Sequence, residues 1–332
     1  MSHGHTHDES SEHRPRKQEQ LPASDEVTEV APGILRTQLP IDMPGLGHVN
    51  CYVMEDERGI AVVDPGLPGQ EPWNDLVDRL GRAGYAVADV HTVVVTHSHP
   101  DHYGGAQRLR AEADADIVTH ETFRTMVDWA SEESEDSADL DVNSFDEQME
   151  LIERMLSRPS PWGGRRAGPP PEFFERMRAD ADARPSGTYQ PVRPTHPLAE
   201  GQTIRLARRE WIAMHTPGHT SDHLCLYDPE HGVVLTGDHV LPTITPHISG
   251  MSPSDDPLAL FFHSLGRMAE LADVSVALPA HGHPFSDLGS RSVDIIDHHE
   301  DRLDIIRKAS IELTAGTVND FMRVLFRERS WG

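Results

Sequence analysis

The 332-residue sequence has few lysines, few cysteines and no long apolar run. Lys17 and Lys308 are its two lysines, and acidic residues outnumber basic ones by 55 to 29, for a formal net charge of −26. Such a charge disfavours a surface that coats nucleic acid or an anionic membrane. No apolar stretch approaches the roughly 18 residues that suggest a membrane span. We therefore expect neither nucleic acid nor a membrane as a partner. Composition leaves a high-salt cytoplasm and a GC-rich genome open as origins of the acidity.

The two cysteines, Cys51 and Cys225, each lie in an apolar run. Positions of this kind are typical of buried thiols, and so few cysteines disfavour a disulfide framework. The polar N-terminus does not resemble a signal peptide. We therefore expect a reducing, cytoplasmic location and no structural disulfide.

Composition divides the chain into three parts. Residues 1–25 contain His3, His5, His7 and His13 among polar residues, which is typical of a disordered tail, with metal scavenging as an alternative. Strand and helix patterns predict one domain over residues 26–310, interrupted at 121–200 by two amphipathic helices that we interpret as an inserted lid or pocket wall. Residues 311–332 are expected to form a helical tail.

One stretch joins an apolar strand to a group of metal-ligand side chains. Residues 93–95 are all valine, which predicts a buried strand, and His97, His99, Asp101 and His102 follow directly. In an extended loop, side chains two residues apart point to the same side. Imidazoles and carboxylates are the usual ligands of zinc and other first-row metals. The alternative is a solvated loop rich in histidine, and the recurrence of the pattern later in the chain argues against it.

Three further motifs place ligand-type side chains next to predicted strands. His219 lies in the run Thr-Pro-Gly-His-Thr at residues 216–220. Asp238 follows the strand-like residues 233–237, and His281 lies in the run Pro-Ala-His-Gly at residues 279–282. Several motifs in order are far more specific than any one short motif.

Taken together, these four motifs resemble the signature of the metallo-β-lactamase superfamily, over roughly residues 28 to 300. The resemblance implies an α+β fold, a four-layer αββα sandwich, here with a helical insertion and a short C-terminal helical tail. That tail resembles the start of a winged-helix appendage found in some relatives.

The resemblance also implies which residues bind metal. His97, His99 and His219 would hold one ion, Asp101, His102 and His281 a second, and Asp238 would span both. An aspartate beneath the metals corresponds to Asp64, which would orient a ligand histidine or a loop amide, with capping of the Pro-Gly turn as the alternative. The resemblance does not make His223 a ligand, and this histidine is structural, a supporting residue outside the ligand set, or a substrate-facing group.

Seven ligands exceed the four that one tetrahedral zinc usually takes, so they fit two metals about 3.5 Å apart. We expect two Zn²⁺, with Fe or Mn as alternatives. A hydroxide bridging the metals would be the nucleophile, and Asp101 and Asp238 would be the catalytic carboxylates, with Asp101 receiving a proton during turnover.

The run at residues 216–223 resembles the glyoxalase II-like or LACTB2-like branch of the superfamily, which implies hydrolysis of a thioester or ester, such as an acyl-CoA or a small-thiol conjugate. The small-molecule substrate would carry an anionic handle for Arg165 and Arg166, although a solvated helix face also explains these arginines. A nuclease or phosphodiesterase, a mononuclear iron persulfide dioxygenase and a binding module with vestigial metals remain alternatives. The sequence leaves the oligomeric state open.

Overall fold

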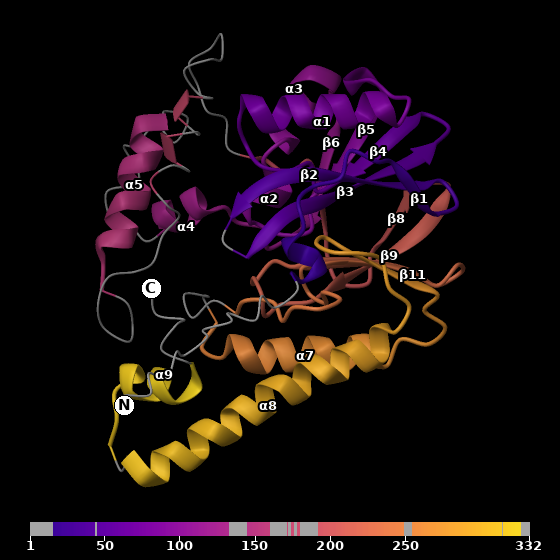
Figure 1. Ribbon diagram of the computed structural model, residues 1–332. Coiled ribbons are helices and arrows are strands. Elements are labelled where there is room, and N and C mark those ends of the chain that lie inside the picture. The colour runs from indigo at the N-terminus through magenta and orange to yellow at the C-terminus, as the bar shows by residue number, and fades with distance from the viewer. Residues whose placement is uncertain are drawn as a thin grey trace, which may run out of the picture.

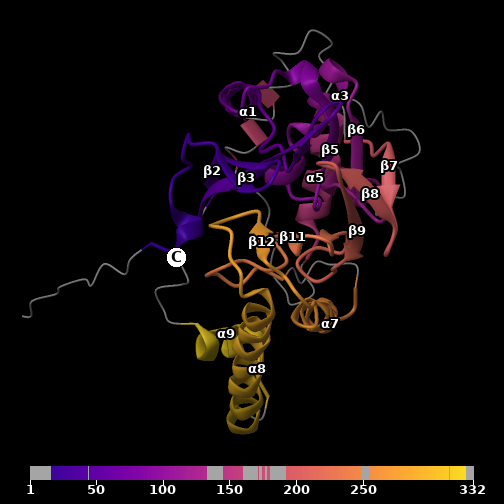
Figure 2. The same cartoon turned by 90° about the vertical axis from the view of Figure 1, so that its right-hand side faces the viewer.

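The computed structural model describes residues 16–43, 45–132, 145–159, 171, 174–175, 178–179, 192–248, 254–313 and 315–326. Its strands form two mixed sheets that face each other, and helices cover the outer side of each sheet (Figure 1, Figure 2). This arrangement confirms the expected αββα sandwich.

The first sheet changes from antiparallel to parallel along its strand order. In that order its strands are β1 (Thr28–Ala31), β2 (Ile34–Met43), β3 (Leu46–Asp56), β4 (Gly59–Val63), β5 (Val90–Val94), β6 (Asp116–His120) and β7 (His196–Leu198). The first three pairings are antiparallel, and β4 to β7 run parallel. Residues 60–63 of β4 are all apolar and three of the five residues of β5 are valine, as expected for strands that are buried on both faces.

The second sheet carries the second half of the domain. Its strands, in spatial order, are β12 (Val276–Pro279), β11 (Val233–Gly237), β10 (Leu224–Asp228), β9 (Arg209–His215) and β8 (Thr203–Leu206). β11 and β12 are parallel, so their carboxyl ends lie at the same edge of the sheet. Loops at the carboxyl ends of parallel strands are the usual place for a binding site in such sheets.

Three apolar layers hold the sandwich together. The central layer lies between the sheets and contains Tyr52 and Trp211, which are almost completely buried. α1 (Gln70–Arg82) and α3 (Ala106–Ala113) cover the outer face of the first sheet, where Leu76 and Leu109 enter the core. α7 (Pro257–Ala269) and α8 (Leu288–Leu313) cover the second sheet through Phe261 and its neighbours. No helix in the described part of the chain is long and apolar enough to cross a membrane.

The insertion differs in extent from the expected 121–200. α4 (Met126–Glu132) and α5 (Phe145–Ser157) pack on each other through Val127, Met149 and Ile152. The expected second helix near residues 170–177 lies mostly outside the described residues, and so do Arg165 and Arg166. The end at residue 200 was wrong, because β7 already belongs to the first sheet. This three-residue strand, His-Pro-Leu, is too short to show a strand pattern in the sequence.

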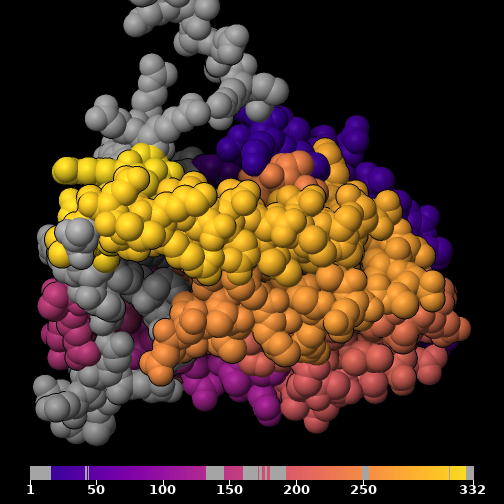
Figure 3. Space-filling model, turned by 90° about the horizontal axis from the view of Figure 1, so that it is seen from below, coloured from indigo at the N-terminus to yellow at the C-terminus, as the bar shows by residue number. Residues whose placement is uncertain are grey.

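Both ends of the expected domain also need correction. Residues 1–15 lie outside the described residues, but residues 18–20 form a 3₁₀ helix, η1 (Gln18–Gln20), in which Glu19 is fully buried. The ordered structure therefore begins before residue 26. The boundary at residue 310 falls inside α8, which continues to Leu313, and α9 (Val318–Leu325) follows it. α8 packs on both α7 and α9, and it runs across the lower face of the molecule (Figure 3).

Candidate metal centre

The seven predicted ligand side chains all meet in one place. The loop after β5 and the four-residue helix α2 (Pro100–Tyr103) carry four of them, and the other three follow β9, β11 and β12. Proline at the first position of α2 turns the chain so that the last two ligands of the loop lie on a helical turn. The seven form two clusters, one of His97, His99, His219 and Asp238, and one of Asp101, His102 and His281.

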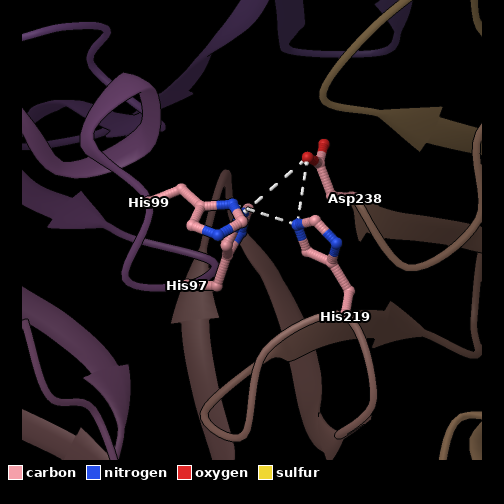
Figure 4. A group of neighbouring side chains, drawn as sticks. All are labelled: His97, His99, His219 and Asp238. Carbon is pink, nitrogen blue, oxygen red and sulfur yellow. Dashed lines mark hydrogen bonds and ion pairs between the residues drawn. The ribbon is translucent and has the colours of Figure 1, made fainter. Parts of the chain in front are cut away.

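In the first cluster, three imidazoles and a carboxylate face one another (Figure 4). His99 Nδ1 lies 3.0 Å from His97 Nε2 and 3.0 Å from His219 Nε2. Asp238 Oδ2 lies 3.4 Å from His219 Nε2 and 3.9 Å from His97 Nε2. Because three ring nitrogens cannot all satisfy one another as donor and acceptor pairs, the arrangement fits a cation between them.

The second cluster is smaller and shares one carboxylate with the first. Asp101 Oδ2 lies 3.4 Å from His102 Nε2 and 3.6 Å from His281 Nε2. Asp238 reaches the same nitrogens, with Oδ1 at 3.3 Å from His281 Nε2 and Oδ2 at 3.7 Å from His102 Nε2. Asp238 thus contacts ligand atoms of both clusters, as expected of a carboxylate that spans two metals.

The spacing and the unpaired atoms both fit metal ions. A metal–nitrogen bond of about 2.1 Å places the corners of a tetrahedron roughly 3.4 Å apart, and the contacts above run from 3.0 to 3.9 Å. Within the described residues, His102 Nε2, His281 Nε2 and Asp238 Oδ1 are buried and have no hydrogen-bond partner. Buried polar atoms rarely lack partners, so these three are best explained as metal ligands. The donor set fits two divalent first-row metals.

Asp64 organises the two histidines at the ends of the first loop. Its Oδ2 accepts a hydrogen bond from His102 Nδ1 at 2.9 Å and one from Thr96 Oγ1 at 2.8 Å, and its Oδ1 accepts from the Thr96 amide at 2.9 Å. Thr96 Oγ1 lies 3.1 Å from His97 Nδ1 and can accept from it. Asp64 therefore contacts both His102 and a loop amide, and the Nε2 atoms of His97 and His102 are left for the two clusters.

The two later histidines are fixed by backbone carbonyls. His219 Nδ1 donates to the carbonyl of His247 at 2.6 Å, and His281 Nδ1 donates to the carbonyl of His48 at 2.6 Å. Donation from Nδ1 leaves the Nε2 lone pair free for a metal. Both carbonyls come from parts of the chain distant in sequence, so the orientation of these ligands depends on the assembled fold.

His223 supports the spanning carboxylate instead of binding a metal. It is fully buried, and its Nε2 accepts a hydrogen bond from the backbone amide of Asp238 at 3.1 Å. Its Nδ1 lies 2.8 Å from Thr216 Oγ1, which can accept the proton. Gly237, at φ +50°, lies so close that a Cβ there would be 2.7 Å from His223 Nε2. The Gly-Asp pair at the end of β11 therefore lets the Asp238 amide approach this histidine.

Burial and mutual charge set the protonation of the centre. Burial and the neighbouring His219 lower the pKa of His99 to about 3. Burial alone would raise the pKa of Asp101, but His102 and His281 outweigh it and lower the pKa to about 2. Burial opposes protonation of His102, yet Asp101 and Asp64 raise its pKa well above the usual range. The centre therefore concentrates negative charge that attracts protons or cations.

Several supporting residues were missed by the sequence analysis. Asn50 Nδ2 donates to the carbonyls of Pro279 and Gly282, both at 2.8 Å, and Tyr52 Oη donates to the Pro279 carbonyl at 2.7 Å. These bonds hold the loop that carries His281. A buried asparagine within the apolar run of β3 was the available signal. The carbonyl acceptors of the later histidines have no side-chain signature at all.

A second missed contact joins two ligand loops. Ser98 lies between His97 and His99, and its Oγ donates to Asp222 Oδ1 at 3.1 Å. Asp222 is 1% exposed, and burial raises the pKa of its carboxyl. The contact ties the loop after β5 to the loop that carries His219, so it helps bring the first cluster together.

Comparison with known proteins agrees with this geometry. The family model described as the metallo-beta-lactamase superfamily matches residues 44–281, which is most of the chain. The chain therefore belongs to the metallo-β-lactamase superfamily. With both ligand clusters complete, it is a metallo-hydrolase of that superfamily.

Individual relatives are distant but cover most of the chain. The "Probable metallo-hydrolase YqjP" of Bacillus subtilis is 23% identical over 269 residues, which are 79% of this chain and 76% of that protein. The "Acyl-coenzyme A thioesterase MBLAC2" of Gallus gallus is 28% identical over 248 residues, 72% of this chain and 74% of that protein. A beta-lactamase domain protein from Burkholderia ambifaria has a TM-score of 0.69 at 25% identity, covering 92% of this chain and 86% of that one.

Proposed function

We propose that this protein is a dizinc hydrolase of a thioester or ester, such as an acyl-CoA or a small-thiol conjugate. The observation that carries the proposal is the position of Asp238, whose two oxygens face ligand nitrogens of both clusters. A carboxylate in this position supports a pair of metals over a single ion, and the imidazole-rich first cluster suits zinc.

When bound, a metal pair supplies hydroxide from water near neutral pH and polarises the scissile carbonyl. The residues of the chain orient that chemistry. Nδ1 donation by His219 and His281 points their Nε2 atoms inward, and Asp64 does the same for His102. Asp101, whose Oδ2 faces His102 and His281, is the carboxylate that we propose takes up a proton from the attacking water.

Support for the substrate class comes from the family comparison and from the loop before β10. The chicken relative is named an acyl-coenzyme A thioesterase, and the similarity to it covers most of both chains. Residues 216–223 resemble the glyoxalase II-like branch, and within them Asp222 and His223 are buried and accept hydrogen bonds from Ser98 and from the Asp238 amide. We propose that Arg165 and Arg166 meet an anionic handle on the substrate, such as a phosphate or carboxylate.

We also propose a reducing, cytoplasmic setting and a small-molecule substrate as the partner. Cys51 and Cys225 are buried and free, and burial raises the pKa of each thiol, which suits inert core cysteines.

The test begins with metal content and ends with a substrate panel. Elemental analysis of the purified protein should give two zinc ions per chain. The reloaded enzyme is then assayed on acyl-CoA thioesters, small-thiol thioesters, matched oxygen esters, lactones, phosphodiesters and a glutathione persulfide. The proposal expects the highest kcat/KM on a thioester. Faster turnover of a phosphodiester, or one iron per chain with oxygen consumption on the persulfide, would replace it with one of those two activities.

The arginine pair is tested by the double variant Arg165→Ala and Arg166→Ala. Loss of a charge-assisted contact to the handle should raise KM about tenfold while kcat changes little. Arg307→Ala serves as the control, because this exposed arginine pairs with Asp304 on α8. An unchanged KM for the anionic substrate would show that Arg165 and Arg166 do not bind its anionic group. The proposed metal chemistry would be unaffected.

A further inference from the structure

The short N-terminal segment of residues 17–21 lies against two loops of the metal centre. It contains η1, and Glu19 within it is 0% exposed. A buried carboxylate is costly unless its charge is matched by hydrogen bonds or opposite charge. Glu19 therefore requires hydrogen-bond donors from the structure around it.

Glu19 forms hydrogen bonds with the loop that follows Asp238. Its Oε1 accepts hydrogen bonds from the backbone amides of Thr243 at 2.7 Å and Ile244 at 3.0 Å. Its Oε2 accepts a short hydrogen bond from Thr243 Oγ1. Three donors therefore converge on one carboxylate, and two of them are backbone groups in a stretch that forms neither helix nor strand. Glu19 thus satisfies amides that no secondary structure would satisfy.

Two cationic side chains fix the carbonyls of the same loop. Lys17 Nζ donates to the carbonyl of Thr243 at 2.8 Å. From α8, Arg291 donates to the carbonyls of Leu241 and Ile244, both at 2.8 Å. Residues 241–244 are thus clamped through their backbone from the N-terminal segment on one side and from α8 on the other. Because these three contacts are made to backbone carbonyls, they fix the path of the loop directly.

The clamped stretch lies between two groups that matter to the first metal cluster. Asp238 precedes it, and the carbonyl of His247, which accepts from His219 Nδ1 at 2.6 Å, follows three residues after Ile244. A shift of the loop at Thr243 would therefore move the acceptor that orients His219. A ligand histidine whose outer partner is displaced loses part of its metal affinity.

The same segment also contacts the loop of the second cluster. Gln18 Oε1 accepts from the amide of His283 at 2.7 Å, and the Leu21 carbonyl lies 2.8 Å from His48 Nδ1. His48 in turn accepts from the Gly282 amide through Nε2, and its carbonyl orients His281. Residues 17–21 therefore support both segments that provide carbonyl acceptors for the later histidines, the loop at residues 241–247 and strand β3.

Residues 17–21 pack tightly against their neighbours at two glycines. A Cβ on Gly47 would lie 2.2 Å from the Leu21 carbonyl oxygen. A Cβ on Gly282 would lie 3.3 Å from both Gln18 Oε1 and Glu19 Cγ, and the φ of Gly282, +84°, also favours glycine. The segment therefore packs closely against strand β3 at Gly47 and against the loop that carries His281 at Gly282.

We propose that Glu19 is a positioning residue of the metal centre, which fixes residues 241–247 so that the His247 carbonyl orients His219. The inference concerns metal retention and does not depend on the identity of the substrate, so it can fail while the thioesterase proposal stands. It also predicts that Glu19 acts mainly on the cluster of His97, His99 and His219, because its direct contacts are to that loop.

The experiment titrates the metal-free, full-length protein with Co²⁺ alone and follows its visible absorption, which reports the ligand set of each binding event. Glu19→Ala should weaken binding at the three-histidine cluster by about tenfold or more and change its absorption spectrum. Glu19→Gln keeps an acceptor oxygen for the two amides and should recover most of the affinity. Glu26→Ala is the control, because it removes an exposed carboxylate from the neighbouring segment.

Thr243→Val provides a second test of the proposal in case Glu19→Ala does not fold. It removes one of the three donors to Glu19 and keeps both amides, so it should lower Co²⁺ affinity in the same direction by a smaller factor. If Glu19→Ala unfolds, the decision rests on Glu19→Gln and Thr243→Val. Folded variants that bind Co²⁺ with wild-type affinity and an unchanged spectrum would overturn the proposal, as would equal losses in Glu26→Ala.

Discussion

The seven candidate ligands fall into two halves by their place in the sequence, and the two halves are built by different means. The first half lies at residues 97–102, and the second half comprises His219, Asp238 and His281. In the first half, the ligands lie close together in sequence, and side chains orient them, since Asp64 and Thr96 hold His102 and His97. In the second half, the ligands come from three separate loops, and the backbone carbonyls of remote residues orient His219 and His281. The first half is therefore encoded locally, whereas the second depends on the correct assembly of the sandwich.

Asp238 belongs to the second half and contacts both clusters, so its loss should have the largest effect. Asp238→Ala removes contacts to both clusters at once. We expect the metal content to fall from two per chain toward none, and kcat/KM to fall roughly a thousandfold or more, since residues that act as a unit lose activity together. Elemental analysis after dialysis and steady-state kinetics measure both effects.

Asp228→Ala is not a suitable control for this variant, because Asp228 is itself buried and paired with Arg209. Asp273→Asn is better, since it alters an aspartate outside the centre. If Asp238→Ala kept one full equivalent of tightly bound metal, the two clusters would be independent sites, and the idea of a shared carboxylate would be wrong.

The next prediction separates side-chain support from backbone support. Asp64→Asn removes the charge that faces His102 and Thr96, and should lower metal affinity or activity by about 10- to 100-fold. His247→Ala keeps the carbonyl that orients His219, so it should change metal affinity less than about threefold. Competition with a chelator measures both affinities.

Asp114→Asn is the matched control for Asp64→Asn. Both aspartates have φ +53°, which asparagine tolerates well, but Asp114 is exposed at the end of α3. Equal losses in Asp64→Asn and Asp114→Asn would mean that backbone conformation, and not the contact to His102, explains the effect. A large loss in His247→Ala would show that the second half also relies on side chains.

The same contrast explains how much of the molecule could be predicted from its sequence. The ligands were predictable because each motif follows or precedes an apolar strand, as His97 follows β5 and Asp238 follows β11. The two-sheet fold was implied by family resemblance, and its order of strands agreed with hydrophobic patterning. Strand β7 was missed because three residues that include a proline carry no periodic pattern.

The partners of the later histidines could not be predicted, and the reason is physical. A carbonyl acceptor such as that of His247 is present in every residue, so no residue type marks it. Glu19 was assigned to a disordered tail because its neighbours are polar and charged, and local composition does not report a contact more than two hundred residues away. Only the assembled sheets bring such groups together.

The smallest predicted effect tests the support beneath His281. Tyr52→Phe removes a buried hydrogen bond of 2.7 Å to the Pro279 carbonyl, the residue that ends β12. Because Asn50 also donates to this carbonyl, the loop should keep its place, and unfolding free energy should fall by about 1 kcal/mol. Tyr85→Phe, which loses a part-buried bond to Glu55, should cost less than about 0.5 kcal/mol. Urea unfolding of the metal-free proteins measures both. A loss above about 3 kcal/mol in Tyr52→Phe would show that this one bond, rather than the whole assembly, positions the second half of the centre.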